Sequence, residues 1–380
     1  MQTKNFDSLI RFDPLKFMNA ASPEQWRAVL QENAWMLGQH SGILNRSGWD
    51  ELVNFCLGET QFGENRYCLG ALEKTYYRIK PIIVLSSLLH TLVKRCNMVR
   101  AKRRFPLQWP IEDRFVNFLL QCMSQADNNR VPDFWPENKD FAFVLTHDVE
   151  SERGMKNVLQ LADVERARGF RSCFNIVPEL YPVRDGILQE LQDQGFEVGV
   201  HGLIHDGKYY FSERTFNQRT ARINHYFRKW GAGGFRSPIN HRNPVWMQAL
   251  DMQYDSSFFD TDPYEPMPGG VMSIWPFLIG HFVELPNTLP QDSTLFIMMG
   301  LTTIDIWKQK LDWIVNNHGM ALINVHPDYI DFSGGGICKV SRRTYPLRLY
   351  TELLDYVKEK TNCWHALPGE LAAYWRRRNA

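Results

Sequence analysis

The stretch FAFVLTHDVE, residues 141–150, joins an apolar run to two acidic residues. The apolar residues of 141–147 predict a strand that is buried on both faces, as in a parallel sheet. Asp148 and Glu150 follow at once, and two carboxylates beside a buried strand are costly unless a cation or a metal ion compensates them. The same two acids also suit the first turn of a following helix, where the helix dipole favours negative charge. The residues alone leave both interpretations open.

The same alternation of apolar run and amphipathic stretch continues to the C-terminus. Strands are expected at 141–147, 171–177, 196–201, 235–236, 281–286 and 320–326. Helices are expected at 151–168, 183–194, 211–230, 244–252, 303–317 and 346–359. Strands separated by helices of this length predict βαβ units and a parallel sheet. So many repeats favour an α/β barrel over an open sheet.

The region before this alternation has a different pattern. Residues 1–138 are predicted to form helices and loops, with helical spacing of apolar positions at 23–36 and 111–123. The polar segment NNRVPDFWPENKD, residues 128–140, carries two prolines and is interpreted as a linker. We therefore expect an N-terminal helical region of open role at 1–138 and a catalytic domain at 139–380.

Residues 80–105 combine an apolar stretch with a basic end. The interpretation we favour is a packed helix with a solvated basic end, where cations suit the C-terminal helix dipole. The alternative is an amphipathic helix lying on an anionic membrane surface, which would make the protein peripheral at the inner face of the membrane. The basic residues are Lys94, Arg95, Arg100, Lys102, Arg103 and Arg104.

The overall composition indicates which classes of partner and which cellular compartment to expect. A net charge of +1 favours neither nucleic acid nor an acidic partner, and no nucleic-acid partner is expected. The seven cysteines form no C-x-x-C pair and lie mostly in apolar contexts, as expected of free thiols in a reducing compartment. The N-terminus has no apolar signal-peptide core, and the chain has no run of 18 apolar residues. These features predict a cytoplasmic protein.

Several side chains with chemistry fall at the carboxyl ends of the expected strands. His201 ends one strand and begins H-x-x-x-H, which on a helical turn would bring its imidazole and that of His205 to one ion. Arg236 and His326 end two further strands. Because parallel strands gather their carboxyl ends at one rim, we expect these groups to meet the two carboxylates there.

Such a set suits metal-assisted hydrolysis. One carboxylate and two histidines form a three-ligand site with open positions, and the second carboxylate is free to take a proton from water. Arg236 would orient that carboxylate by a bidentate contact, and His326 would protonate a leaving group. Each residue also has an ordinary alternative: capping histidines, a structural ion pair, or a hydrogen-bonded histidine at the core edge.

Four motifs, taken in order, resemble the polysaccharide deacetylase family, the NodB-like enzymes of carbohydrate esterase family 4. They are LTHDVE (145–150), HGLIH (201–205), RSP (236–238) and LINVH (322–326). The resemblance covers about residues 140–370 and implies a distorted (β/α) barrel of about seven strands. It also implies removal of an N-acetyl, or sometimes O-acetyl, group from a sugar or polysaccharide, with zinc as the usual metal and cobalt or nickel able to substitute.

The family's roles carry over to matching positions. The resemblance implies that Asp148 is the general base, that Arg236 orients it and that His326 is the general acid. The implied metal ligands are Glu150, His201 and His205. Pro238, in the third motif, and Asp255, in Tyr254-Asp255-Ser256-Ser257, are expected to contact substrate.

Three departures from the family pattern bear on these roles. The acidic motif is D-V-E rather than two adjacent aspartates, so the roles of Asp148 and Glu150 could be exchanged. Gly202 stands where serine or threonine is usual, and the third motif continues as R-S-P-I-N without the usual aromatic residue and glycine. Two other functions therefore stay open: hydrolysis of a C–N bond in a small cyclic amide, and sugar binding without catalysis. The expected setting is surface-polysaccharide metabolism.

Overall fold

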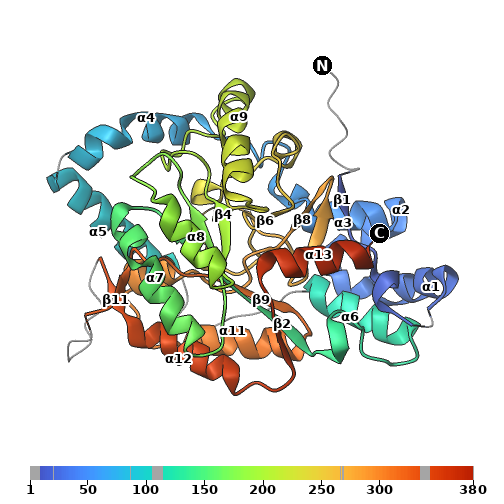
Figure 1. Cartoon of the computed structure of the whole chain (residues 1–380). Helices are drawn as coiled ribbons and strands as arrows, with labels where there is room; N and C mark the ends of the chain where they lie inside the picture. Colours follow the sequence, from blue (N-terminus) through green and yellow to red (C-terminus); the bar gives the residue numbers. More distant parts are fainter. Residues whose placement is uncertain are drawn as a thin grey trace.

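The computed structural model describes residues 9–19, 21–85, 87–104, 114–265, 267, 269–333 and 343–379. At its centre is a curled sheet of ten strands with helices around it (Figure 1). Eight strands of this sheet pair in parallel with a neighbour, and seven of them follow one another along one path. In sheet order they are β9 (Met320–Asn324), β2 (Phe141–Val149), β3 (Cys173–Ile176), β4 (Glu197–Val200), β5 (Gly234–Phe235), β6 (Tyr254–Asp255) and β8 (Phe282–Glu284).

The two ends of this parallel set meet. After β8 the chain runs beside β9, where the N–H groups of Thr288 and Leu289 donate to the Leu322 carbonyl at 3.2 and 3.0 Å. The sheet thereby curls toward closure, and the predicted distorted seven-stranded α/β barrel is confirmed. The six predicted strands are present, and β6 was missed because polar residues flank Tyr254 on both sides and no apolar run marks the strand.

The remaining strands extend this barrel. β7 (Phe277–Ile279) and β1 (Ile10–Arg11) add antiparallel strands beyond β8, and β12 (Cys363–His365) pairs with the start of β2. A separate parallel pair joins β10 (Ile330–Asp331) to β11 (Tyr345–Pro346). Because β1 lies near the N-terminus, the N-terminal region contributes directly to the main sheet.

Helices cover the outside of the barrel. Five predicted helices are confirmed with ends shifted by a few residues: α7 (Glu152–Arg166), α8 (Asp185–Asp193), α9 (Glu213–Trp230), α11 (Asp305–Asn316) and α12 (Leu347–Lys358). α7 and α9 each begin after a serine whose hydroxyl accepts from the backbone of the first turn. The helix expected at 244–252 is only one turn, α10 (Pro244–Met247), and α13 (Pro368–Arg378) was not predicted.

The N-terminal helices separate into two groups in space. In Figure 1, α1–α3 and α6 lie beside β1 and α13, whereas α4 and α5 run along the opposite edge of the barrel. The bounds are α1 (Pro23–Asn33), α2 (Ser41–Ser47), α3 (Trp49–Leu57), α4 (Ala71–Leu85), α5 (Ser87–Arg104) and α6 (Arg114–Ala126). The helices expected at 23–36 and 111–123 correspond to α1 and α6, with residues 111–113 outside the described part.

The expected linker at 128–140 is instead part of the core. Phe134 and Trp135 are buried, and the Phe134 ring stacks on Trp275 with centroids 4.9 Å apart. Phe17 stacks on Trp375 from the C-terminal helix at 4.6 Å. Each of these contacts joins a ring of the N-terminal region to a ring of the barrel region, and separating the two regions would lose all of them. The N-terminal region and the barrel therefore share one core.

The described part of residues 80–105 forms the end of α4 and the whole of α5 rather than one helix. Among the described residues, no helix is both long and apolar enough to cross a bilayer. α5 exposes Leu92 and Val99 together with the cations Arg95 and Arg100. It also contacts the π-helical turn η7 (Ser293–Met298), which lines the cleft described next. All six described cysteines are free thiols.

Candidate active site

A cleft of about 820 Å³ opens at the carboxyl ends of the parallel strands. β2 delivers Asp148 and, one residue after its end, Glu150; the residue after β4 is His201; and His326 follows β9. The lining also includes residues that come from loops and from η7. They are Ser151, His205, Ile239, Asn240, Glu265, Met267, Gln291, Ser293, Ile297, Met298, Asp328, Tyr329 and Arg343.

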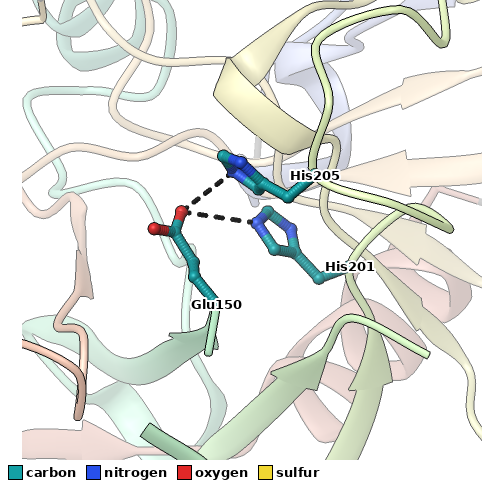
Figure 2. Close-up of side chains that lie close together, drawn as sticks. All are labelled: Glu150, His201 and His205. Carbon is teal, nitrogen blue, oxygen red and sulfur yellow. Dashed lines mark ion pairs between the residues drawn. The ribbon is translucent and has the colours of Figure 1, made fainter. Parts of the chain in front are cut away.

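Three of the lining side chains could hold a metal ion. One ligand atom each from Glu150, His201 and His205 lies within 4.8 Å of the other two. Figure 2 shows both imidazoles turned toward the same carboxylate, with Nε2 of His205 3.0 Å and Nε2 of His201 3.8 Å from Glu150 Oε1. The structure thus brings the three expected ligands together.

The environment of His201 provides a test of whether a cation fits. Its Nδ1 lies 3.0 Å from the Arg236 carbonyl oxygen, to which it donates, so the lone pair is on Nε2. Nε2 is buried and has no hydrogen-bond partner in the described part of the chain. A buried acceptor without a partner is costly, and this one points at a carboxylate beside a second imidazole. Together the two imidazole nitrogens and the carboxylate form the ligand set of an open zinc-type site.

The H-x-x-x-H segment is not a helical turn, contrary to the expectation. Residues 201–207 form a bent loop in which Gly202 and Gly207 adopt positive φ values of 61° and 75°. The bend at Gly202 lies between the two histidines, whose ring centroids are 5.2 Å apart. The two imidazoles were expected to approach each other through helical spacing, and here a glycine in a left-handed conformation brings them together instead.

Gly202 is also required by what packs beneath it. A Cβ atom at this position would lie 2.5 Å from Cγ and 2.6 Å from Cδ of Pro238. Pro238 is buried there and is not among the residues that line the cleft, and its expected contact with substrate stays a prediction.

We expect Gly202→Ser to destabilise the protein by about 2–5 kcal/mol, because left-handed backbone costs a non-glycine residue about 1–2 kcal/mol and overpacking adds about 1–3 kcal/mol. The measurement is the urea midpoint at unchanged m-value. Gly186→Ser is the matched control, since Gly186 has open space around its Cβ position. Equal midpoints for both variants would contradict the close packing of Gly202 on Pro238.

Asp148 is held as a carboxylate. Asn175 Nδ2 donates to its Oδ1 at 3.0 Å, and Asn324 Nδ2 donates to its Oδ2 at 2.8 Å. Burial opposes its ionisation, but the surrounding positive charge, that of Arg236 included, outweighs burial and lowers the pKa of Asp148. Its Oδ2 lies 3.8 Å from His201 Nε2, next to the three metal-ligand candidates. An ionised, oriented carboxylate in this place can accept a proton from water.

Arg236 is fully buried and positioned by three groups. Nη1 donates to Asn287 Oδ1 at 2.6 Å, and Nη2 donates to Thr146 Oγ1 at 2.9 Å. Only Nε faces Asp148, with 3.4 Å to Oδ1. The expected bidentate contact with the carboxylate is therefore wrong, and the guanidinium acts on Asp148 through charge and one edge.

His326 is paired with an acid that the sequence did not indicate. Its Nδ1 lies 2.6 Å from Asp292 Oδ1, and Tyr345 donates to the other oxygen of Asp292 at 2.9 Å. Burial lowers the pKa of His326, but Asp292 outweighs it and raises this pKa to about 10. Nε2 of the resulting imidazolium lies 3.8 Å from Glu150 Oε1, so it has a proton to donate at the cleft.

Other groups around the acidic turn were also missed. Asp328 accepts from the Glu150 N–H at 3.1 Å and from the Ser151 hydroxyl. Asn175 is the register partner of Asp148 on β3, and Asn324 lies on β9. A single amide in an otherwise apolar strand is a signal that could have identified both asparagines, since a buried amide requires a partner.

Asp255 lies away from the cleft. It is fully buried in β6, where the Ser257 hydroxyl donates to Oδ1 at 2.6 Å. Burial raises the pKa of Asp255 and of the neighbouring Glu284, so this pair favours holding a proton. Asp255 is a buried residue of β6 outside the cleft lining, and its expected contact with substrate stays a prediction.

Solved structures similar to this chain include two proteins named as polysaccharide deacetylases. The one from Mycobacterium smegmatis is 18% identical, with 64% of this chain and 93% of that chain covered and a TM-score of 0.49. The one from Pseudomonas aeruginosa PAO1 is 13% identical, with 66% and 96% covered and a TM-score of 0.47. Puue allantoinase is 13% identical, with 64% and 92% covered and a TM-score of 0.47. No family model and no curated protein matches the sequence.

Proposed function

We propose that the protein is a divalent-metal-dependent hydrolase that removes an acetyl group from a sugar unit of a glycan. The observation that carries this proposal is the group formed by Glu150, His201 and His205, with the unpaired Nε2 of His201 facing the carboxylate. Zinc suits this nitrogen and oxygen donor set, and cobalt or nickel would be accepted by the same ligands.

The chain's own residues supply the acid and base chemistry. When bound, the ion would polarise the acetyl carbonyl and lower the pKa of the attacking water to about 7. Asp148, held by Asn175 and Asn324, accepts the proton of that water. His326, protonated through Asp292, donates a proton to the departing amine or hydroxyl as acetate is released. The two groups thus divide the roles of base and acid.

Acetate release from a panel of N- and O-acetylated glycans tests the proposal, with metal content measured on the same preparation. The panel includes N-acetylglucosamine oligomers and a surface polysaccharide. We expect about one equivalent of divalent metal together with release of acetate. Hydrolysis of a small cyclic amide with no acetate from any glycan would favour the alternative C–N hydrolase. Sugar binding without metal or acetate release would favour a non-catalytic relative.

The membrane interpretation of residues 80–105 stays a prediction, and the charge pattern supports it. Residues 74–111 contain nine lysines and arginines and no aspartate or glutamate. We expect binding to anionic vesicles to fall about tenfold or more in the double variant Arg95→Glu/Arg100→Glu, since each surface cation contributes about 1 kcal/mol. The measurement is vesicle co-sedimentation, with Arg214→Glu/Arg228→Glu on α9 as the control. Equal binding by all three proteins would contradict the membrane contact and leave the packed-helix interpretation.

A further inference from the structure

A second cavity, of about 260 Å³, lies next to the cleft and is built jointly by the two regions of the chain. The N-terminal region contributes Phe62, Asn65, Tyr67 and Cys68, which lie between α3 and α4. The barrel contributes Tyr210 and the segment 240–242. Asn240 and Met267 line both cavities, so the cleft and the second cavity are adjacent.

The wall between the two cavities is fixed by a buried ion pair. Arg242 Nε donates to Glu59 Oε2 at 2.8 Å, and its Nη2 donates to the other oxygen of the same carboxylate. Arg242 Nη1 donates to the Asn240 carbonyl at 2.9 Å, and Gly270 N–H donates to Glu59 at 2.6 Å. Because both charges are buried and matched, the N-terminal region holds this segment of the barrel in place.

The backbone of the same wall is strained. Ile239 and Asn240 adopt positive φ values of 63° and 52°. Left-handed backbone is uncommon for a β-branched residue and persists only where the surroundings impose it. Ile239 faces the cleft and Asn240 faces both cavities, so the strained residues stand at the junction between them. Strain at this position is consistent with a wall shaped for a ligand.

The lining of the second cavity suits an uncharged polar ligand. Its arginines are engaged within the protein, Arg242 with Glu59 and Arg66 with the Gly58 and Gly63 carbonyl oxygens. The exposed side chains of this lining include the Phe62 ring, 47% exposed, and those of Asn65 and Cys68. The half-buried Glu73 carboxylate also lines it and accepts from the Gly70 N–H at 2.7 Å. An aromatic face beside amide groups binds a sugar ring by stacking and hydrogen bonds, whereas an anion would find no available cation in this lining.

We propose that the second cavity holds the sugar unit next to the acetylated one, so that the substrate is an oligomeric glycan and the N-terminal region completes its binding groove. This inference rests on the proposed deacetylase function. It gives residues 59–73 a role in substrate binding.

Chain-length dependence is the first test. Phe62→Ala is expected to raise KM for the N-acetylglucosamine tetramer about fivefold and to leave KM for the monosaccharide and kcat for both unchanged, because a stacked aromatic contact contributes about 1 kcal/mol. Leu72→Ala is the control, since Leu72 is 88% exposed and lines neither cavity. Equal kcat/KM of the wild-type protein for monosaccharide and tetramer would overturn the inference.

Cysteine protection provides a readout that does not depend on turnover. Cys68 lines the second cavity and is exposed, and Cys96 on α5 is exposed outside both cavities. We expect the tetramer, but not the monosaccharide, to slow alkylation of Cys68 several-fold in the full-length metal-loaded protein, with Cys96 as the internal reference in peptide mass spectra. Acetate release without protection of Cys68 would overturn the groove and leave the deacetylase proposal standing. Protection without acetate release would support the groove and contradict the deacetylase.

Discussion

His201→Ala is expected to remove metal binding and acetate release together. The side chain is 1% exposed, its Nδ1 is fixed by the Arg236 carbonyl, and its Nε2 has no partner among the described residues except the ion we propose. Loss of a residue that only orients a ligand costs about 10- to 100-fold in metal affinity, so loss of a ligand should cost at least about 100-fold. Titration of the metal-free protein with zinc, followed by acetate release, measures both effects.

A matched histidine and a stability measurement make this prediction specific. His225→Ala is the control, because His225 is exposed on α9 and lies outside the cleft. Zinc should raise the unfolding temperature of the wild-type protein and of His225→Ala but not of His201→Ala, since a ligand stabilises only the state that binds it. A His201→Ala protein that keeps one equivalent of zinc and full activity would exclude the proposed metal centre.

The meeting of the site residues at one rim could be predicted because each of these buried strands ends in a polar residue that has no place in a core. Asp148, His201, Arg236 and His326 all follow apolar runs, and parallel strands necessarily gather them at one rim. What could not be predicted is pairing between residues far apart in the chain. Asp292 reaches His326 across 34 positions through the fold, and no local period relates them.

The same distinction applies to the N-terminal region. Its helices follow from local apolar spacing, but its attachment to the barrel depends on contacts such as Phe17 with Trp375 and Glu59 with Arg242. Prolines and polar residues made 128–140 resemble a linker, and the burial of Phe134 and Trp135 outweighs that local composition. Tertiary packing determines whether such a segment is buried, because turn-forming residues restrict the backbone conformation and leave burial undetermined.

The sequence placed both carboxylates of D-V-E at the rim but could not assign their roles. Residues two apart in a strand face the same way, so alternation treats Asp148 and Glu150 alike. Hydrogen bonds distinguish them. Amides from β3 and β9 take up both oxygens of Asp148, whereas Glu150 lies just past the strand and turns its Oε1 to His205. This geometry favours Glu150 as the metal ligand and Asp148 as the base.

Asp148→Asn is therefore expected to lower kcat by about 10²- to 10⁴-fold while the protein keeps its metal ion. The amide cannot accept the proton of the attacking water, and the ligand set of Glu150, His201 and His205 is unchanged. Metal content and kcat measured on one preparation test both parts. Asp163→Asn is the control, because Asp163 is exposed on α7 in a surface ion pair.

The two measurements also decide between the roles that the D-V-E motif leaves open. If Asp148 were the ligand and Glu150 the base, Asp148→Asn would lose the ion along with activity, and excess zinc would partly restore turnover. If Asp148 is the base, excess zinc restores nothing, because the missing function is proton acceptance. A variant that keeps both its ion and its wild-type kcat would show that neither role belongs to Asp148, although Asn175, Asn324 and Arg236 all converge on its carboxylate.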